Sequence, residues 1–363
     1  MGRNLQKLAL WAVPLMFLAV LFYWAIGKVL LLGLEQDWFA LFGDVHFQKV
    51  ILFTIGQALL STLLCLIFGI PGAYLLYRKR FVGRSFIRAL ISVPFVLPTI
   101  VVAIAFQGFG NFVSPLIAIL IAHLFLNYSI VIRTVGGVWS KLDVEIENAA
   151  ELDGATKLQR FFFVSLPMLK SSITSAGVLV FLYCVSSFGI ILLLGDGKIS
   201  SIETEIYFSL TQFLDFKTAS AYALLQTLIT VAAFGISKRL GNSEAGIETT
   251  NEVESTTPLS LREWPLIAGS LFFVISVLVL PIMGLLSKFT WAGLSDLSGN
   301  GERNLLNISV WQAVGNSARN IVIAAGLAMM IGVLVSWLLS RSRRAWLEIP
   351  FLLPMGISSV VLG

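Results

Sequence analysis

The feature that most constrains this chain is a series of apolar runs, each close to the length of a membrane-spanning helix. The first run, residues 8–27, contains no charged residue and follows Arg3 and Lys7. A helix needs about 20 mainly apolar residues to cross the hydrocarbon core of a bilayer. Only 12% of the 363 residues are charged, which is roughly half the share found in a soluble domain. The sequence therefore predicts an all-α polytopic membrane protein.

Eight complete runs and the start of a ninth follow this pattern. They cover residues 8–27, 50–77, 89–109, 115–132, 171–195, 219–237, 266–286 and 310–339, and the ninth begins at residue 347. Arginine and lysine gather on alternate connections, most densely between residues 78 and 88. Cytoplasmic loops of membrane proteins carry such an excess of positive charge. We therefore expect a multi-pass protein of the cell (plasma or inner) membrane, surrounded by lipid, with its N-terminus in the cytoplasm.

The second half of the chain repeats part of the first. Residues 53–80 align without a gap to residues 316–343, so that Gly69 faces Gly332 and Arg78 faces Arg341. After a shorter connection, Pro-Phe-Val-Leu-Pro of the first copy matches Pro-Phe-Leu-Leu-Pro of the second. A repeat of this length indicates two equivalent helical bundles. Both copies run from outside to inside, so we expect one complete bundle, the start of a second parallel one, and a chain that is the N-terminal fragment of a longer protein.

One charged segment lies between two apolar runs on the predicted cytoplasmic side. Residues 145–152 favour a helix, and Gly154 can adopt the left-handed conformation that often ends one. Residues 156–164 fit a second short helix, which we expect Pro167 to break. Two short helices held against the membrane surface would make a docking element for a soluble partner.

This polar segment also has a characteristic internal spacing. Residues 149–167 read Ala-Ala, three residues, Gly, nine residues, Val-x-Leu-Pro. The spacing resembles the cytoplasmic coupling loop of type I ABC-importer permeases, which reads Glu-Ala-Ala, three residues, Gly, nine residues, Ile-x-Leu-Pro. Asn148 stands where that family has Glu, and Glu147 precedes it. The resemblance implies an ATPase-coupling loop that includes Glu147, Asn148, Ala149, Ala150, Gly154, Val164, Leu166 and Pro167.

The repeat adds a narrower resemblance, to the fused double-length permeases of ferric-iron and thiamine ABC importers. A second local match supports it, because Ser-Phe-Gly at 187–189 and Ile-Glu-Thr-Glu-Ile-Tyr at 202–207 look like the segment that those permeases carry after their fifth helix. The resemblance implies the type I ABC importer transmembrane fold. It also implies ABC ATPase subunits at the cytoplasmic face and an extracytoplasmic substrate-binding protein. ATP would be used by the partner subunit, and no cofactor would be bound by this chain.

On this basis the chain divides into five parts. Residues 1–48 form an N-terminal transmembrane helix and external loop, and residues 49–240 form the first permease domain. Residues 241–263 are rich in Ser, Thr, Asn and Glu, which is typical of a disordered linker, here cytoplasmic. Residues 264–310 hold another transmembrane helix and external loop. Residues 311–363 begin the second permease domain.

Three polar residues inside the runs are candidates for a translocation path. His123 and Asn127 lie four residues apart, hence on one face of a helix, and Ser187 lies in the fifth run. Polar groups in a span usually face protein or a water-filled path, so interhelical hydrogen bonding and a path are both open. The runs hold many aromatic side chains and no carboxylate, which favours an organic cation over a ferric ion. Ferric iron and thiamine nevertheless both stay open as substrates.

The sequence lacks the signatures of an enzyme. No phosphate loop of the Gly-x-x-x-x-Gly-Lys-Ser/Thr kind occurs, so the chain would not hydrolyse ATP by that route. We find no Ser-His-Asp set typical of hydrolases. A metal site is not indicated either, because Cys65 and Cys184 fall inside apolar runs and the chain has only two histidines. The net charge of +5 follows from membrane topology, so no nucleic-acid partner is implied.

Two other kinds of protein fit a polytopic chain. A secondary transporter of a small solute, driven by an ion gradient, can show internal repeats. Such a transporter is expected to place acidic groups inside its spans, and none of these runs contains Asp or Glu. An integral membrane enzyme would need clustered acids, bases or metal ligands at the bilayer surface. The sequence favours the permease subunit of an importer over both.

Overall fold

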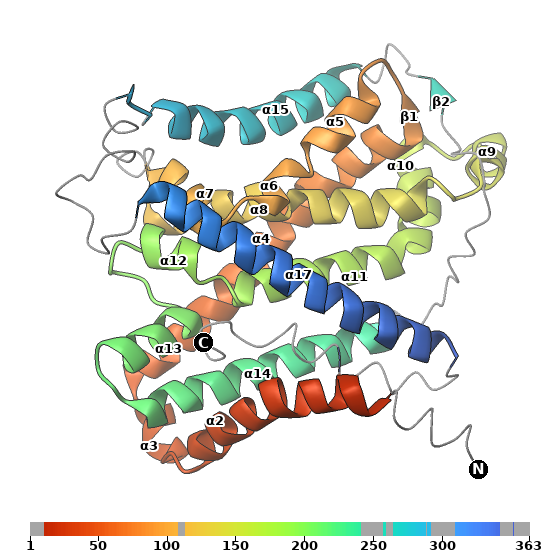
Figure 1. The fold of residues 1–363 in the computed structure, drawn as a ribbon. Coiled ribbons are helices and arrows are strands. Elements are labelled where there is room, and N and C mark those ends of the chain that lie inside the picture. The colour runs from red at the N-terminus through yellow and green to blue at the C-terminus, as the bar shows by residue number, and fades with distance from the viewer. Residues whose placement is uncertain are drawn as a thin grey trace. The chain divides into compact units, whose positions relative to one another are not determined.

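The computed structural model describes residues 11–107, 113–240, 257–258, 264–287, 289–291, 309–341 and 351. Over these residues the chain is almost entirely helical, as Figure 1 shows. It divides into two compact units, one made mainly of residues 30–284 and the other of residues 1–29 and 285–355. The all-α architecture predicted from the apolar runs is confirmed.

The elements follow one another along the chain in a simple order. The first part contains η1 (a π-helical turn, Ala19–Tyr23), α2 (Trp24–Leu34), α3 (Trp38–Gly43), α4 (Val45–Arg78), β1 (Lys79–Arg80), α5 (Arg84–Leu90), α6 (Val93–Val96), α7 (Thr99–Gln107) and α8 (Pro115–Trp139). The second part contains α9 (Val144–Leu152), α10 (Lys157–Arg160), η2 (Phe161–Ser165), α11 (Leu166–Val185), α12 (Gly189–Leu194), α13 (Ile202–Thr211), α14 (Phe216–Leu240), β2 (Thr257–Pro258), α15 (Trp264–Ser287) and α17 (Val310–Ser340).

Five of the described helices are long and apolar enough to cross a membrane. They are Val45–Arg78, Pro115–Trp139, Lys157–Val185, Phe216–Ile236 and Trp311–Ser340. Four of them coincide with the second, fourth, sixth and eighth predicted runs, although α4 and α8 extend several residues beyond them. Lys157–Val185 overlaps only the first part of the fifth run and begins well before it. The multi-pass architecture therefore rests on the same segments that the apolar pattern picked out.

Small residues let α4 and α8 approach closely at the centre of the larger unit. A Cβ atom added at Gly69 would lie 2.6 Å from Cγ1 of Val131, and one added at Gly72 would lie 2.5 Å from Oη of Tyr128. Neither position has room for a side chain. Helices in a bilayer gain little from the hydrophobic effect, so close packing of this kind is what holds them together.

The third predicted run is not one straight span. The helical pair Arg84–Val96 and Thr99–Gln107 is bent by 95° at a short break. Leu97, which precedes Pro98, has an extended backbone with ψ of 138°, because a proline ring disfavours helical geometry in the residue before it. A span over residues 89–109 is therefore corrected to a sharply bent element.

The fifth predicted run is also interrupted. Helix α11 ends at Val185, and the chain resumes as α12 at Gly189. Ser186, Ser187 and Phe188 form the break, at which Ser186 has ψ of 20°. We call these three residues the α11–α12 break. The predicted span over residues 171–195 thus consists of two helices.

Helix α13 lies between the fifth and sixth apolar runs, and it is not a surface helix. It packs against α14 and α4 and buries Ile202, Glu203 and Ile206. Ile202 N donates to Thr54 Oγ1 of α4 at 3.0 Å, which ties the start of α13 to the interior. Two isoleucines four residues apart form an apolar stripe along one face of this helix.

The predicted linker and second copy are described only in part. Helix α17 matches the expected eighth run almost residue for residue. Within the linker, Thr257–Pro258 forms a short parallel bridge with Lys79–Arg80. The rest of residues 241–263 and most of the ninth run lie outside the described residues.

Candidate coupling segment and interior polar cluster

The polar segment on residues 141–168, which we call the coupling segment, begins with a capped helix. Asp143 caps α9 by accepting a hydrogen bond from Glu145 N at 2.9 Å. Glu145 and Glu147 lie in the first turn, where negative charge is favoured by the helix dipole. The sequence therefore fixes where this helix starts.

The end of α9 explains the fixed spacing between Ala150 and Gly154. Gly154 has φ of +86°, which a residue without Cβ adopts at little cost. Gly154 N donates to Glu151 O and Ala155 N donates to Ala150 O, both at 3.0 Å. This pair of hydrogen bonds is a Schellman motif, a common way to end a helix. The left-handed conformation predicted for Gly154 is confirmed.

The second helix of the segment starts with a capping box but does not end where predicted. Thr156 N donates to Gln159 Oε1 at 2.8 Å, and Gln159 N donates to Thr156 Oγ1 at 3.3 Å. The helix then passes through the π-helical turn η2 into α11, so Pro167 does not break it. A proline removes one backbone donor and crowds the carbonyl four residues earlier. The wider turn directly before Pro167 accommodates both effects.

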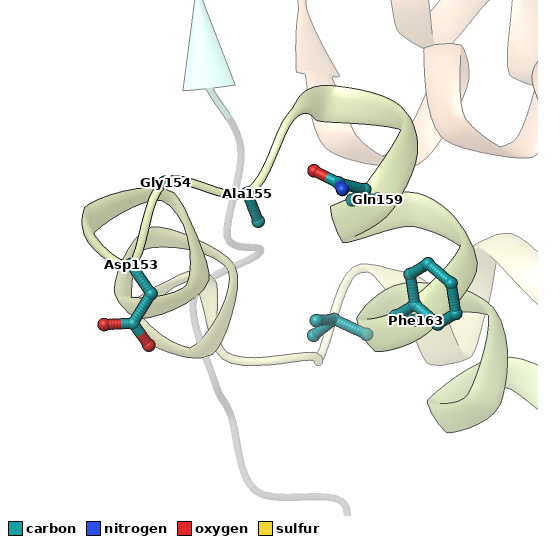
Figure 2. A pocket seen from close by; sticks show the side chains of 6 residues that line it. Asp153, Gly154, Ala155, Gln159 and Phe163 are labelled. Atoms are coloured by element: carbon teal, nitrogen blue, oxygen red, sulfur yellow. The ribbon is translucent and has the colours of Figure 1, made fainter.

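The turn between α9 and α10 borders an open hollow of about 350 Å³. Its lining residues are Asp153, Gly154, Ala155, Gln159, Phe163 and Val164. Figure 2 shows Asp153 and Phe163 on opposite sides of it, with Ala155 and Gln159 between them. Leu152 and Leu158, also on this segment, are 89% and 70% exposed. The segment thus presents apolar side chains around a concave surface.

A buried arginine, which the sequence did not single out as a site residue, anchors the segment. Arg78, at the end of α4, is 3% exposed. Its guanidinium donates to Glu147 Oε2 at 2.7 Å and to the Leu142 carbonyl at 2.9 Å. Ser165 Oγ of η2 donates to the other oxygen of Glu147 at 2.8 Å. The only signal in the sequence was that Arg78 recurs in the repeat as Arg341.

The predicted coupling residues differ in their surroundings. Gly154 and Val164 meet at the hollow. Asn148, Ala149, Gly154 and Pro167 are exposed, whereas Glu147, Ala150, Val164 and Leu166 are half-buried. The carboxylate of Glu147 points into the chain, and the neighbouring Asn148 side chain is on the surface.

Two of the predicted path residues, His123 and Ser187, meet in the interior of the larger unit. His123 Nδ1 lies 3.1 Å from Ser61 Oγ of α4, and His123 Nε2 lies 2.8 Å from Ser187 Oγ at the α11–α12 break. All three side chains are buried. One imidazole therefore links α4, α8 and the break.

Asn127, the third predicted path residue, lies beside a different partner. Its Nδ2 donates to Cys184 Sγ at 3.5 Å. Gln57 Nε2 of α4 donates to the Cys184 carbonyl at 2.8 Å. These contacts join α4 and α8 to the end of α11. The geometry matches interhelical hydrogen bonding, and a path role for these residues stays a prediction.

A buried carboxylate, missed from the sequence, adjoins this cluster. Glu203 of α13 is 1% exposed and accepts a hydrogen bond from Gln226 Nε2 at 2.6 Å. Gln226 Nε2 also lies 3.4 Å from Ser186 Oγ. Glu203 lies between the fifth and sixth apolar runs, so it leaves unchanged the observation that the runs themselves contain no Asp or Glu. Within the described ranges, no group of three or more His, Cys, Asp or Glu residues is placed to hold a metal ion.

About half of the chain matches a known protein family. Residues 65–242 match the family described as the binding-protein-dependent transport system inner membrane component. The match covers slightly less than half of the chain. The matched region runs from the middle of α4 to the end of α14, so it contains the coupling segment, His123, Asn127 and Ser187. Their α4 neighbours Gln57 and Ser61 precede it.

Relatives extend the similarity beyond the matched region. The thiamine transport system permease protein ThiP of Haemophilus influenzae is 30% identical, over 93% of this chain and 64% of the relative. The protein of the same name from Brucella abortus is 31% identical, over 92% of this chain and 63% of the relative. The chain therefore spans slightly less than two thirds of the length of these relatives.

A solved structure supports the fold. A bacterial alginate ABC transporter, in complex with an alginate pentasaccharide-bound periplasmic protein, contains a chain that superposes with a TM-score of 0.57. The sequence identity is 16%, and the superposition covers 66% of this chain and 95% of that one. The superposed part of the chain therefore has the type I ABC importer fold that the resemblance in the sequence implied.

Proposed function

We propose that this chain is a membrane-spanning permease subunit of an ABC importer. The single observation that carries the proposal is the family match over residues 65–242. In this role the chain lines the route of the solute, while a separate partner subunit binds and hydrolyses ATP. The chain itself is then a transport subunit rather than an enzyme, and it holds no cofactor.

The coupling segment is the proposed docking site for the ATPase subunits. Its exposed Leu152 and Leu158 lie near a concave surface, and exposed apolar side chains around a hollow are typical of protein interfaces. Replacing Leu152 by Glu should lower copurification of the ATPase subunits by about tenfold, because interface hot spots contribute roughly 1–2 kcal/mol or more. The matched control is Val82→Glu, since Val82 is fully exposed outside this segment. Equal loss in both variants would refute docking here.

The proposed substrate is thiamine, delivered by an extracytoplasmic binding protein. Support comes from the relatives, which are named as thiamine transport permeases. Deleting the gene that encodes this chain should abolish uptake of labelled thiamine and leave uptake of labelled ferric iron unchanged. Restoring the gene should restore thiamine uptake. Loss of iron uptake alone would assign the transporter to ferric iron instead.

An ion-driven secondary transporter is the alternative, and its energy source separates it from an importer. Such a transporter is expected to place acidic groups inside its spans, and the buried Glu203 lies on α13, outside the apolar runs. The family match also favours ATP as the energy source. Uptake should therefore stop when the partner ATPase is inactivated by a mutation in its nucleotide site. Continued uptake that collapses with an ionophore would support the secondary transporter.

His123, Asn127 and Ser187 are proposed to border the route of the solute through the larger unit. They adjoin the α11–α12 break, and interrupted helices often mark binding regions in transporters. Replacing His123 by Asn should raise the KM for uptake and leave the unfolding temperature nearly unchanged. A fall in stability with an unchanged KM would assign these residues to helix packing alone.

The orientation is proposed from charge. Basic residues follow the end of α4, close to the coupling segment, and positive charge favours the cytoplasmic side. This places the N-terminus, the coupling segment and the linker over residues 241–263 in the cytoplasm. A cysteine introduced at position 82 should then react with a membrane-impermeant maleimide only after the cells are opened.

A further inference from the structure

We propose that Glu147 is a positioning residue that locks the coupling segment to helix α4 through Arg78, so that the segment, α4 and α11 move as one body. This inference rests on the proposed docking of ATPase subunits at the coupling segment. Nothing in the spacing of the segment requires it, because the family pattern places its acidic residue at the position of Asn148.

Arg78, at the end of α4, is buried. Its guanidinium is withdrawn from solvent, with a side chain only 4% exposed, and it contacts one carboxylate, that of Glu147, at 2.7 Å. A buried charge is tolerated when an opposite charge and hydrogen bonds compensate it. Glu147 and the Leu142 carbonyl supply both. The end of α4 is therefore tied to the start of the coupling segment.

The other oxygen of the Glu147 carboxylate contacts a different helix. Glu147 Oε1 accepts from Ser165 Oγ at 2.8 Å, and Ser165 belongs to the π-helical turn that continues into α11. One side chain of α9 thus holds α4 on one side and the start of α11 on the other. A carboxylate with both oxygens engaged is fixed in orientation as well as position.

The two sides of the turn at Gly154 are joined by side-chain contacts. Arg160 of α10 forms an ion pair with Glu151 of α9 across this turn, in addition to the bond between Ser165 and Glu147. Gly154 therefore supplies the conformation of a fixed corner rather than a loose hinge. A movement of the segment by a partner would pass to α4 through Arg78 and to α11 through Ser165.

Glu147 and its neighbour Asn148 have different surroundings. Asn148 is exposed on α9, whereas both carboxylate oxygens of Glu147 are directed at groups within the chain. A partner subunit that reads this end of α9 would therefore contact Asn148. Glu147 would affect transport through Arg78 and Ser165 and not through the partner surface.

The experiment uses the full transporter, with its ATPase subunits and binding protein, reconstituted in liposomes. Glu147→Gln, Arg78→Met and the double variant are compared with Glu145→Gln, which removes an exposed carboxylate from the same helix. Two quantities are measured: copurification of the ATPase subunits and solute transported per ATP hydrolysed. For Glu147→Gln we expect copurification within about twofold of the unmodified transporter and a fall of about tenfold in transport per ATP, the size expected for residues in direct contact.

The double variant tests the pair itself and guards against misfolding, because it removes both charges together. If Glu147 acts through Arg78, the double variant should transport no worse than the poorer single variant. Independent, multiplying losses would overturn the proposal. Loss of ATPase copurification in Glu147→Gln but not in Arg78→Met would also overturn it, by placing Glu147 at the partner surface. Failure of the unmodified transporter to bind any ATPase would instead overturn the proposed function.

Discussion

Helices α4 and α17 carry the same repeated sequence but have different surroundings. In the most apolar window of each helix, 39% of the residues are buried in α4 and 11% in α17. A Cβ atom added at Gly69 would collide with Val131, whereas at Gly332 it would have no atom within 4 Å among the described residues. Arg78 is buried against Glu147, whereas the guanidinium of Arg341 lies 4.1 Å from the ring centre of Trp337.

This difference separates what the repeat encodes from what it does not. Under the alignment of residues 53–80 with 316–343, α17 covers the same part of the repeat as a stretch inside α4. Helix length and register are therefore properties of the repeat itself. The use of its glycines and its arginine depends on α8, α11 and the coupling segment, which pack on α4. Among the described residues, the same repeat position is thus closely packed in one copy and without near neighbours in the other.

The largest contrast is expected for the paired glycines. Gly69→Val should lower the free energy of unfolding by about 3 kcal/mol, because the added side chain overpacks the contact with Val131. Gly332→Val should change it by less than about 0.5 kcal/mol, as is usual for positions without a packing constraint. Thermal unfolding of the purified protein in detergent compares the two. Equal destabilisation would show that both glycines are packed, and the contrast between the copies would be lost.

The paired arginines should differ by a smaller amount. Arg78→Met leaves the half-buried Glu147 without its guanidinium partner, which should cost about 2 kcal/mol, less than for a fully buried pair. Arg341→Met removes a contact with one aromatic ring and should cost under about 1 kcal/mol. The same unfolding measurement applies. A greater loss at position 341 would contradict the asymmetry.

Prediction from the sequence succeeded where a local pattern is sufficient. Run length located α4, α8, α14 and α17, and the spacing at Gly154 identified the left-handed end of α9. These features depend on residues that are close together in the chain, such as a cap, an apolar stretch or a glycine. Fold class and the position of the coupling segment follow from them.

Prediction failed where distant residues decide the structure. Glu203 is charged and lies outside the apolar runs, so no local pattern marks it as buried, yet contacts with Gln226 and Thr54 hold α13 in the interior. The ion pair between Arg78 and Glu147 joins residues 69 positions apart, and the cluster of charges near Arg78 had a sufficient explanation in membrane topology. Pro167 was expected to break a helix, but a π-helical turn compensates for it. No local pattern distinguishes these outcomes.

A third contrast concerns polar residues on the same repeat position. Gln57 of α4 donates to the carbonyls of Cys184 and Thr54 at 2.8 and 3.1 Å, whereas Asn320, its equivalent in α17, is exposed. Gln57→Leu should cost about 1 kcal/mol, which is the usual net value of buried interhelical hydrogen bonds. Asn320→Leu should be neutral or slightly stabilising in detergent. An unchanged unfolding temperature for Gln57→Leu would mean that these bonds contribute nothing net.

The smallest contrast is between the N-terminal caps of α14 and α17, and it depends on pH. The carboxylate of Asp215 accepts hydrogen bonds from Thr218, chiefly from the backbone N–H at 3.1 Å, and these hold the pKa of Asp215 below its usual value. Helix α17 begins instead with an uncharged capping box, in which Gln312 N donates to Ser309 Oγ at 3.2 Å. Only the first cap can titrate.

Because the pKa of Asp215 is lowered on folding, its stabilising contribution is complete above the unfolded value of about 3.9 and disappears as the pH falls through the folded value. Asp215→Asn keeps a capping side chain but removes the charge. The stability difference between the original protein and this variant should therefore shrink from pH 6 to pH 3, by no more than about 0.5 kcal/mol, since the group is exposed and screened. The effect of Ser309→Ala should be the same at both pH values. If the effect of Asp215→Asn were equally constant, the charge of Asp215 would have no part in holding the start of α14.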